Sequence, residues 1–302
     1  MASCWGLPEL LCEFPALSNG TLRGMRKGID TGFRDLVRTY SDLIDTATAP
    51  LQIFLNTLEK AFTDAPWPVI MVLLMVIVWF GARRWQTVLG TFIALCMIGV
   101  FGLWEDTMIT LAMVTVATFV AIIIGLPLGI LMARSDRFQA FLTPMLDVMQ
   151  TLPSFVYLIP VVVIFGIGKV PGLIAVVIYA VPPMIRLTNL GIRLVDREVI
   201  EAADAFGANP KQKLFGVQLP LSLPTIMTGV NQTIMMSLSM VVVASMVGVG
   251  GLGKNVLQAI TNQYFTVGFL NGFALVAIAI IFDRTSQAFG KRLQKHTEVG
   301  HD

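Results

Sequence analysis

The chain has 302 residues, of which 55% are hydrophobic and 13% charged, and its formal net charge is +2. Its mean hydropathy of +0.76 is too high for a typical soluble domain, and the small net charge gives no sign of nucleic-acid binding. The two histidines, His296 and His301, lie at the C-terminal end, so no histidine-based metal or acid–base cluster is expected in the apolar part. Cys96 lies within an apolar run, whereas Cys4 and Cys12 can pair but need not.

Residues 1–64 are predicted to lie outside the membrane. They lack the basic segment and the long apolar stretch of a cleavable signal peptide, so none is expected. Apolar residues recur every three or four positions over residues 21–43, and again over residues 51–62 after Pro50. This spacing predicts two amphipathic helices, which either pack on the rest of the protein or lie in the lipid interface.

Seven charge-free apolar runs follow. They cover residues 65–82, 85–104, 107–133, 148–168, 170–185, 223–247 and 265–282. An α-helix needs about 20 apolar residues to cross the hydrocarbon core of a bilayer. The sequence therefore predicts an all-α, polytopic membrane protein with about seven transmembrane helices. Gly125, Pro127 and Gly129 are expected to loosen or kink the third helix, which membrane helices tolerate.

The lack of charge in these runs bears on the source of energy. A charge at the centre of the bilayer costs about 2.5–3.5 kcal/mol on insertion scales and is usually kept only for function. Runs without Asp, Glu, Lys, Arg or His therefore argue against a proton relay or an ion-coupled carrier. Uphill movement of a solute would then draw its energy from outside the membrane.

The longest polar interruption between two apolar runs covers residues 196–224. Its first part has an apolar face at helical spacing, formed by Val199, Ala202, Ala203 and Phe206. Gly207 can take the left-handed conformation that closes a helix, and Asn209-Pro210 can cap and begin a second one. The segment therefore predicts a short helix, a sharp corner and another short helix, which together form a stiff element that can carry force.

The same segment reads Glu201-Ala202-Ala203, then Gly207, then Val217-Gln218-Leu219-Pro220. This pattern resembles the EAA loop of ABC-importer permeases, with Val217 where isoleucine is usual. The resemblance implies the type I ABC-importer transmembrane fold, and a loop over residues 187–222 that docks into a separate ATPase subunit. The residues implied in this coupling are Glu201, Ala202, Ala203, Gly207, Leu219 and Pro220. An ordinary cytoplasmic hairpin is the alternative.

The resemblance and the basic residues together predict an orientation. The parts are an N-terminal amphipathic tail (1–64), two additional transmembrane helices (65–104), the ABC-importer transmembrane domain (105–286) and a cytoplasmic C-terminal tail (287–302). With the coupling loop in the cytoplasm, 13 lysines and arginines lie inside, and only Lys169 and Lys254 lie in outside loops. Seven spans with the C-terminus inside then place the N-terminus outside, in the cell inner membrane.

Residues 248–253 match GxGxxG, and with Lys254-Asn255 they come one residue short of a phosphate-binding Walker A loop. Such a loop needs a preceding strand and a following helix in a soluble α/β domain, whereas these glycines follow a membrane span. We expect a tight, close-packed outer turn instead. ATP and Mg²⁺ would then bind to the partner ATPase, and no cofactor is expected in this chain.

Residues 150–160 and 179–188 indicate a substrate class. They resemble the permeases for glycine betaine, proline betaine and choline, and the resemblance extends over roughly residues 107–286. Such substrates carry a quaternary ammonium group, which aromatic faces attract by about 0.5–2 kcal/mol each. The candidates to line its path are Phe155, Tyr157, Phe165 and Tyr179, although packing is the simpler interpretation of each one taken singly.

In this family an external binding protein recognises the substrate, and the permease works as a dimer with two ATPase subunits. The resemblance therefore implies a transport subunit without an enzymatic activity of its own. A permease for another small solute, such as an amino acid, is the closest alternative. An ion-coupled carrier or a channel is a further alternative, and a membrane enzyme lacks a nucleophile–base or metal cluster to support it.

Overall fold

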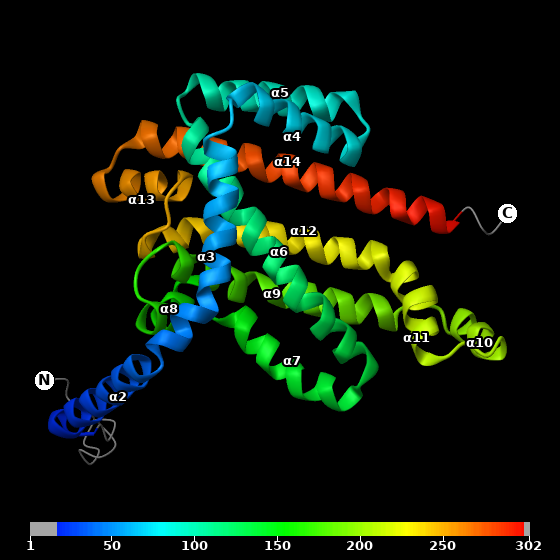
Figure 1. The fold of residues 1–302 in the computed structure, drawn as a ribbon, viewed down its shortest axis with the longest axis horizontal. Coiled ribbons are helices and arrows are strands. Elements are labelled where there is room, and N and C mark those ends of the chain that lie inside the picture. Colours follow the sequence, from blue (N-terminus) through cyan, green and yellow to red (C-terminus); the bar gives the residue numbers. More distant parts are fainter. Residues whose placement is uncertain (1–16, 299–302) are drawn as a thin grey trace, which may run out of the picture. The chain divides into compact units, whose positions relative to one another are not determined.

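The computed structural model describes residues 17–298, and every regular element within them is helical (Figure 1). Contacts divide the chain into two units, Met1–Ala49 and Pro50–Asp302. Cys4 and Cys12 lie outside the described residues. The main helices of the second unit are α4 (Trp67–Ala82), α5 (Trp85–Val100), α6 (Trp104–Arg134), α7 (Asp136–Thr151), α8 (Leu158–Phe165), α9 (Lys169–Arg193), α12 (Leu219–Ala244), α13 (Leu252–Asn262) and α14 (Phe265–Glu298).

The N-terminal segment forms α2 (Asn19–Thr39) and α3 (Ser41–Thr63), so two helices are present as predicted. The prediction that they meet at Pro50 is wrong, because Pro50 lies inside α3. The chain breaks instead next to Thr39 and Ser41, whose hydroxyls donate to backbone carbonyls one turn earlier, at 2.8 and 3.0 Å. Such side-chain hydrogen bonds compete with the helical ladder and favour a helix end.

The part of α3 that follows Pro50 packs on the rest of the protein. Leu55 is buried, and the ring of Phe54 lies 5.7 Å from the ring of Phe119 in α6. Glu59 forms an ion pair of 2.5 Å with Lys169 at the start of α9. Of the two interpretations left open by the sequence, packing on the protein therefore applies to this part of the helix.

Four segments are long and apolar enough to cross a membrane: 104–134, 169–193, 210–247 and 265–290. Two bent helix pairs, α3 with α4 and α7 with residues 154–165, raise the number to six if each pair is one span. Helices α4 and α5 have 16 residues each, about 24 Å, which is shorter than the roughly 30 Å of a hydrocarbon core. The all-α, polytopic membrane fold is confirmed, but the seven apolar runs are not seven full-length helices.

The run over residues 148–168 shows this most clearly. Helix α7 ends at Thr151, and the chain turns by 112° before residues 154–165 continue. Leu152 is extended at ψ 134°, as expected for a residue that precedes a proline, and Pro153 has no N–H to continue the helix. The hydroxyl of Tyr157 donates to the carbonyl oxygen of Met149 across the bend and so ties its two arms together.

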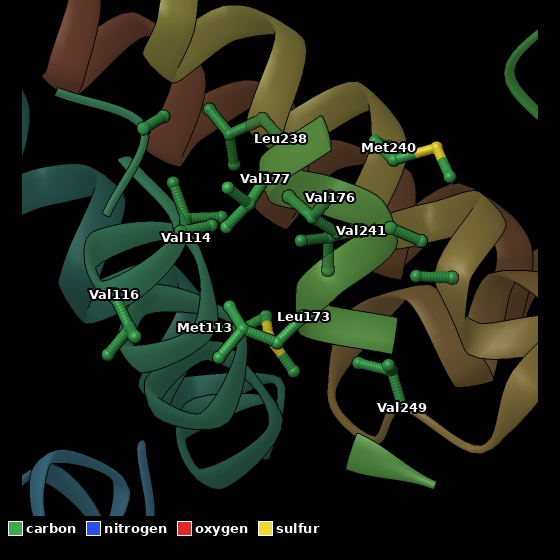
Figure 2. Close-up of a cluster of buried hydrophobic side chains, with 14 of the residues drawn as sticks. Met113, Val114, Val116, Leu173, Val176, Val177, Leu238, Met240, Val241 and Val249 are labelled. Atoms are coloured by element: carbon green, nitrogen blue, oxygen red, sulfur yellow. The ribbon is translucent and has the colours of Figure 1, made fainter. Parts of the chain in front are cut away.

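The core is built around α9, which lies between α6 and α12 (Figure 1). Figure 2 shows aliphatic side chains of these three helices pointing toward one another, among them Val114, Leu173, Val177 and Val241. All four are almost completely buried. Since lipid tails are as apolar as these side chains, close packing rather than exclusion from water stabilises their contact in a membrane.

Gly125 and Gly129 allow α6 and α9 to approach closely. A Cβ atom at Gly125 would lie 2.8 Å from Met184, and one at Gly129 would lie 2.5 Å from Cβ of Thr188 and 2.8 Å from the carbonyl oxygen of Ile185. Helix α6 runs unbroken through these residues and through Pro127. The two glycines therefore serve helix packing in a pattern that is common between membrane helices.

We expect the substitution Gly129→Val to lower stability by about 1–3 kcal/mol or to prevent folding, because the new side chain would have to displace Thr188 and backbone atoms of α9. The apparent Tm of the purified protein in detergent measures this effect. Gly99→Val is the matched control, since no neighbouring atom lies within 4 Å of a Cβ there. Equal melting temperatures for the two variants would contradict the packing role.

Candidate functional site

A short helix, α10 (Arg197–Ala205), projects from the chain after α9. It begins at Asp196, whose carboxylate accepts a hydrogen bond of 2.9 Å from the backbone N–H of Glu198. It ends at Gly207, which has φ +75°, in the left-handed region that favours glycine. The N–H of Gly207 donates to Asp204 at 2.9 Å, so the glycine closes the helix as the sequence predicted.

A second short helix, α11 (Pro210–Lys213), follows the corner. Asn209 and Gln212 form a reciprocal capping box, in which each side chain accepts from the backbone N–H of the other at 2.9 Å. Residues 214–218 form a π-helical turn that leads into α12 without a break. The predicted helix, corner and helix over residues 196–224 are therefore present, and the corner is joined directly to a membrane helix.

Ion pairs connect the two arms of the corner. Lys213, at the end of α11, pairs with Asp204, near the end of α10, at 2.5 Å. Arg197 pairs with Glu201 along α10 at 3.1 Å, but both side chains are exposed, and such a pair contributes little. Leu214 is buried at the base of the corner. Movement of α10 is therefore transmitted through a short, cross-linked segment to the first turn of α12.

The apolar face of α10 has no partner in the part of this chain that the structure describes. Phe206 is 93% exposed, Val199 is 40% exposed, and no side chain of α10 is buried. The nearby Phe215 is also exposed. The periodicity that predicts an amphipathic helix thus leads to an apolar surface open to solvent, and such surfaces mark sites of protein–protein contact.

The residues of the EAA pattern fall into two groups. Glu201 and Ala202 are exposed on α10 and Ala203 is half-buried, while Gly207 forms the corner. Leu219 and Pro220 form the first turn of α12. The pattern therefore brackets the projecting corner and the start of the membrane helix to which it is joined.

The position of α10 in the second unit agrees with the distribution of basic residues. Figure 1 shows α10 and α11 at the same end of the helices as the turn between α4 and α5, the turn between α6 and α7, and the C-terminal end of α14. These turns contain Arg83-Arg84 and Arg134 to Arg137. The turn before α9, next to Lys169, lies at the other end.

The four candidate aromatic residues do not form one cluster. Tyr157 and Tyr179 are paired edge to face, with ring centroids 5.8 Å apart. Tyr157 is buried and Tyr179 half-buried, whereas Phe155 is 58% exposed and Phe165 is half-buried. Only the tyrosine pair lies at a structural junction, where the bend after α7 meets α9. The interaction of any of the four with substrate stays a prediction.

Comparison with known proteins identifies the family. The model of the family described as "binding-protein-dependent transport system inner membrane component" matches residues 125–295, which is more than half of the chain. The chain belongs to this family. It is therefore the membrane-embedded permease of an ABC importer and a transport component rather than an enzyme, and its family works with an ATPase and a substrate-binding protein.

Two relatives show how far the similarity of this permease extends. It is 44% identical over 271 residues to the glycine betaine/proline betaine transport system permease protein ProW of Escherichia coli (strain K12), covering 90% of this chain and 76% of ProW. It is 47% identical over 229 residues to the glycine betaine/carnitine transport permease protein GbuB of Listeria monocytogenes, covering 75% of this chain and 81% of GbuB.

A solved structure confirms the fold of this permease. The MetNI methionine ABC transporter in an inward-facing conformation matches with a TM-score of 0.57 and 24% sequence identity, over 61% of this chain and 93% of the matched chain. At this identity the match establishes the fold alone. The predicted type I ABC-importer transmembrane fold is thus confirmed.

Two ion pairs of the permease escaped sequence analysis. Arg186 and Arg193 of α9 pair with Asp147 and Asp136 of α7, the second pair at 2.7 Å. Residues so far apart in the chain leave no pattern that would reveal them. Helix α9 also extends to Arg193, beyond the predicted run of 170–185, so it does carry charges toward the α10 end. These pairs fasten α7 to the core helix that leads into α10.

The glycine-rich segment of the permease is a packed turn, as predicted. Gly251 has φ +84°, and a Cβ atom there would lie 2.5 Å from the hydroxyl of Thr110. The N–H of Leu252 donates to that hydroxyl at 2.9 Å, and the amide of Asn255 donates to Asp106 at 2.6 Å. The segment lies between two helices rather than after a strand, so the context of a phosphate-binding loop is missing.

Proposed function

We propose that this permease imports quaternary amines such as glycine betaine, and that α10 is the element through which a separate ATPase drives it. The observation that supports the coupling role is the 93% exposure of Phe206 on a short, capped and ion-paired helix. Exposed aromatic residues with unburied neighbours are typical anchors of a protein–protein contact. ATP and Mg²⁺ would bind to the ATPase, and closure of its subunits would push α10 and tilt α12.

The proposal includes an arrangement of subunits. The permease forms a homodimer, each copy contacts one ATPase subunit at α10, and an external binding protein delivers the substrate from the other side. The distribution of basic residues supports a cytoplasmic location of α10 and of the C-terminus, with Lys169 outside. Residues 1–64 would then lie outside, where the ion pair of Glu59 with Lys169 tethers α3.

The substrate class rests on the relatives. The names of ProW and GbuB refer to glycine betaine, proline betaine or carnitine, all of which carry a quaternary ammonium group. The tyrosine pair of Tyr157 and Tyr179 is the best placed of the aromatic candidates, since it lies where the bend between α7 and α8 meets the core. The faces of these rings would attract the cation while it passes.

Uptake by reconstituted vesicles tests this function. The permease is reconstituted with its ATPase and binding protein, and labelled glycine betaine is supplied on the side of the binding protein. We expect uptake that requires ATP, that unlabelled proline betaine or choline reduces, and that methionine leaves unchanged. Uptake without ATP would favour a carrier or a channel, and competition by methionine would favour an amino-acid permease.

A further inference from the structure

A groove of about 470 Å³ runs between α5 and α14. The small side chains of Gly90 and Ala94 line it on α5, and Phe273 and Ile280 line it on α14. Ile280 is 55% exposed. An apolar groove with exposed walls on two membrane helices faces lipid rather than water.

The groove is about as long as one leaflet is thick. Its lining on α14 extends from Phe273 to Arg284, which at about 1.5 Å per residue is roughly 16 Å. Half of a hydrocarbon core of about 30 Å is roughly 15 Å. The groove therefore has the length that a single acyl chain of one leaflet would occupy.

One end of the groove is positively charged. Arg84, just before α5, and Arg284, near the end of α14, both line it and both are exposed. Neither arginine forms an ion pair within the described residues, and no acidic side chain lines the groove. The neighbouring Asp283 accepts hydrogen bonds from Asn231 and Gln287 instead, at 3.0 and 2.6 Å. The two guanidinium groups thus leave an unmet demand for an anion.

The geometry points to a binding site for an anionic glycerophospholipid. Its phosphate lies between Arg84 and Arg284, and one acyl chain follows Gly90 and Ala94 along α5. Guanidinium groups suit phosphate because they offer several donors in a fixed plane. Basic pockets between membrane helices on the cytoplasmic side are known sites for anionic head groups. The leaflet follows from the orientation in the proposed function, but the pairing of groove and charge does not depend on the substrate.

Such a lipid would strengthen the attachment of the α4–α5 hairpin. Helix α5 lies against α14 and α4, and the groove leaves part of its surface next to α14 without a protein partner. A lipid in the groove would contact both helices at once and so stabilise their packing.

Lipid retention and melting temperature test the site. The full-length permease is delipidated in detergent and titrated with phosphatidylglycerol, phosphatidylcholine or inorganic phosphate. Bound lipid is measured by mass spectrometry and stability by thermal melting. We expect phosphatidylglycerol to bind and to raise the Tm, and phosphatidylcholine and phosphate to do neither. Stabilisation by phosphate alone would overturn the lipid assignment.

Three variants locate the binding. Arg84→Gln with Arg284→Gln should bind phosphatidylglycerol about 30-fold more weakly, from roughly one power of ten or slightly less for each lost contact near the surface. Arg134→Gln with Arg137→Gln removes the same charge elsewhere at that end and should bind normally. Ala94→Phe should block the acyl chain without a change of charge. Equal binding by the first pair and the wild type, equal loss in both pairs, or normal binding by Ala94→Phe would overturn the proposal.

Discussion

Replacement of Gly207 by valine is expected to abolish solute uptake while the variant remains in the membrane. Gly207 has φ +75°, and a β-branched residue in this left-handed region costs about 1–2 kcal/mol or more. No atom lies within 4 Å of a Cβ placed there, so the effect comes from backbone conformation rather than from a clash. Relaxation of the corner would turn α10 away from α11, and force on α10 would no longer reach α12.

ATP-driven uptake in vesicles, together with immunodetection of the membrane fraction, measures this effect. Gly207→Asn is the matched control, because asparagine adopts the left-handed conformation more readily than other non-glycine residues do. We expect the asparagine variant to retain most of the uptake. Wild-type uptake by the valine variant would refute the role of the corner in coupling.

The substitution Phe206→Ser is expected to reduce association with the ATPase by tenfold or more. Anchoring aromatic residues at the centre of an interface commonly contribute 2 kcal/mol or more, which is about a 30-fold change in affinity. Because Phe206 is 93% exposed in this chain, its removal should leave the fold and the melting temperature of the permease unchanged. Co-purification with a tagged ATPase, followed by a binding titration, measures the loss.

Phe265→Ser is the control for this variant. Phe265 is 83% exposed at the start of α14, at the opposite end of that helix from Arg284. Its loss removes the same apolar surface without touching α10, so ATPase association should be unchanged. If the Phe206 variant co-purified as well as the wild type, docking at this face of α10 would be excluded.

Local signals made the corner predictable from sequence. A glycine at a helix end and an Asn-Pro pair at a helix start each act within a few residues, and the structure shows both at Gly207 and at Asn209-Pro210. The exposure of Phe206 could not be predicted in the same way. Amphipathic periodicity indicates that a face will be buried, but it does not indicate whether the covering surface belongs to the same chain.

Other features depend on tertiary contacts that sequence does not reveal. The Leu152-Pro153 bend has a local signal, but the apolarity of residues 148–168 favoured a single span, and apolarity does not distinguish one helix from two. The ion pairs of Arg186 and Arg193 with α7 join residues far apart in the chain. Pro50 was expected to end a helix, yet it lies inside α3.

The central claim is that α10 faces the cytoplasm and contacts the ATPase through Phe206. A variant with Phe206→Cys, in which serine replaces the three native cysteines, allows a direct measurement with a membrane-impermeant maleimide in inside-out and right-side-out vesicles. We predict labelling only in inside-out vesicles, and protection from labelling when the ATPase subunit is bound. Labelling in right-side-out vesicles, or equal labelling with and without the ATPase, would contradict the claim.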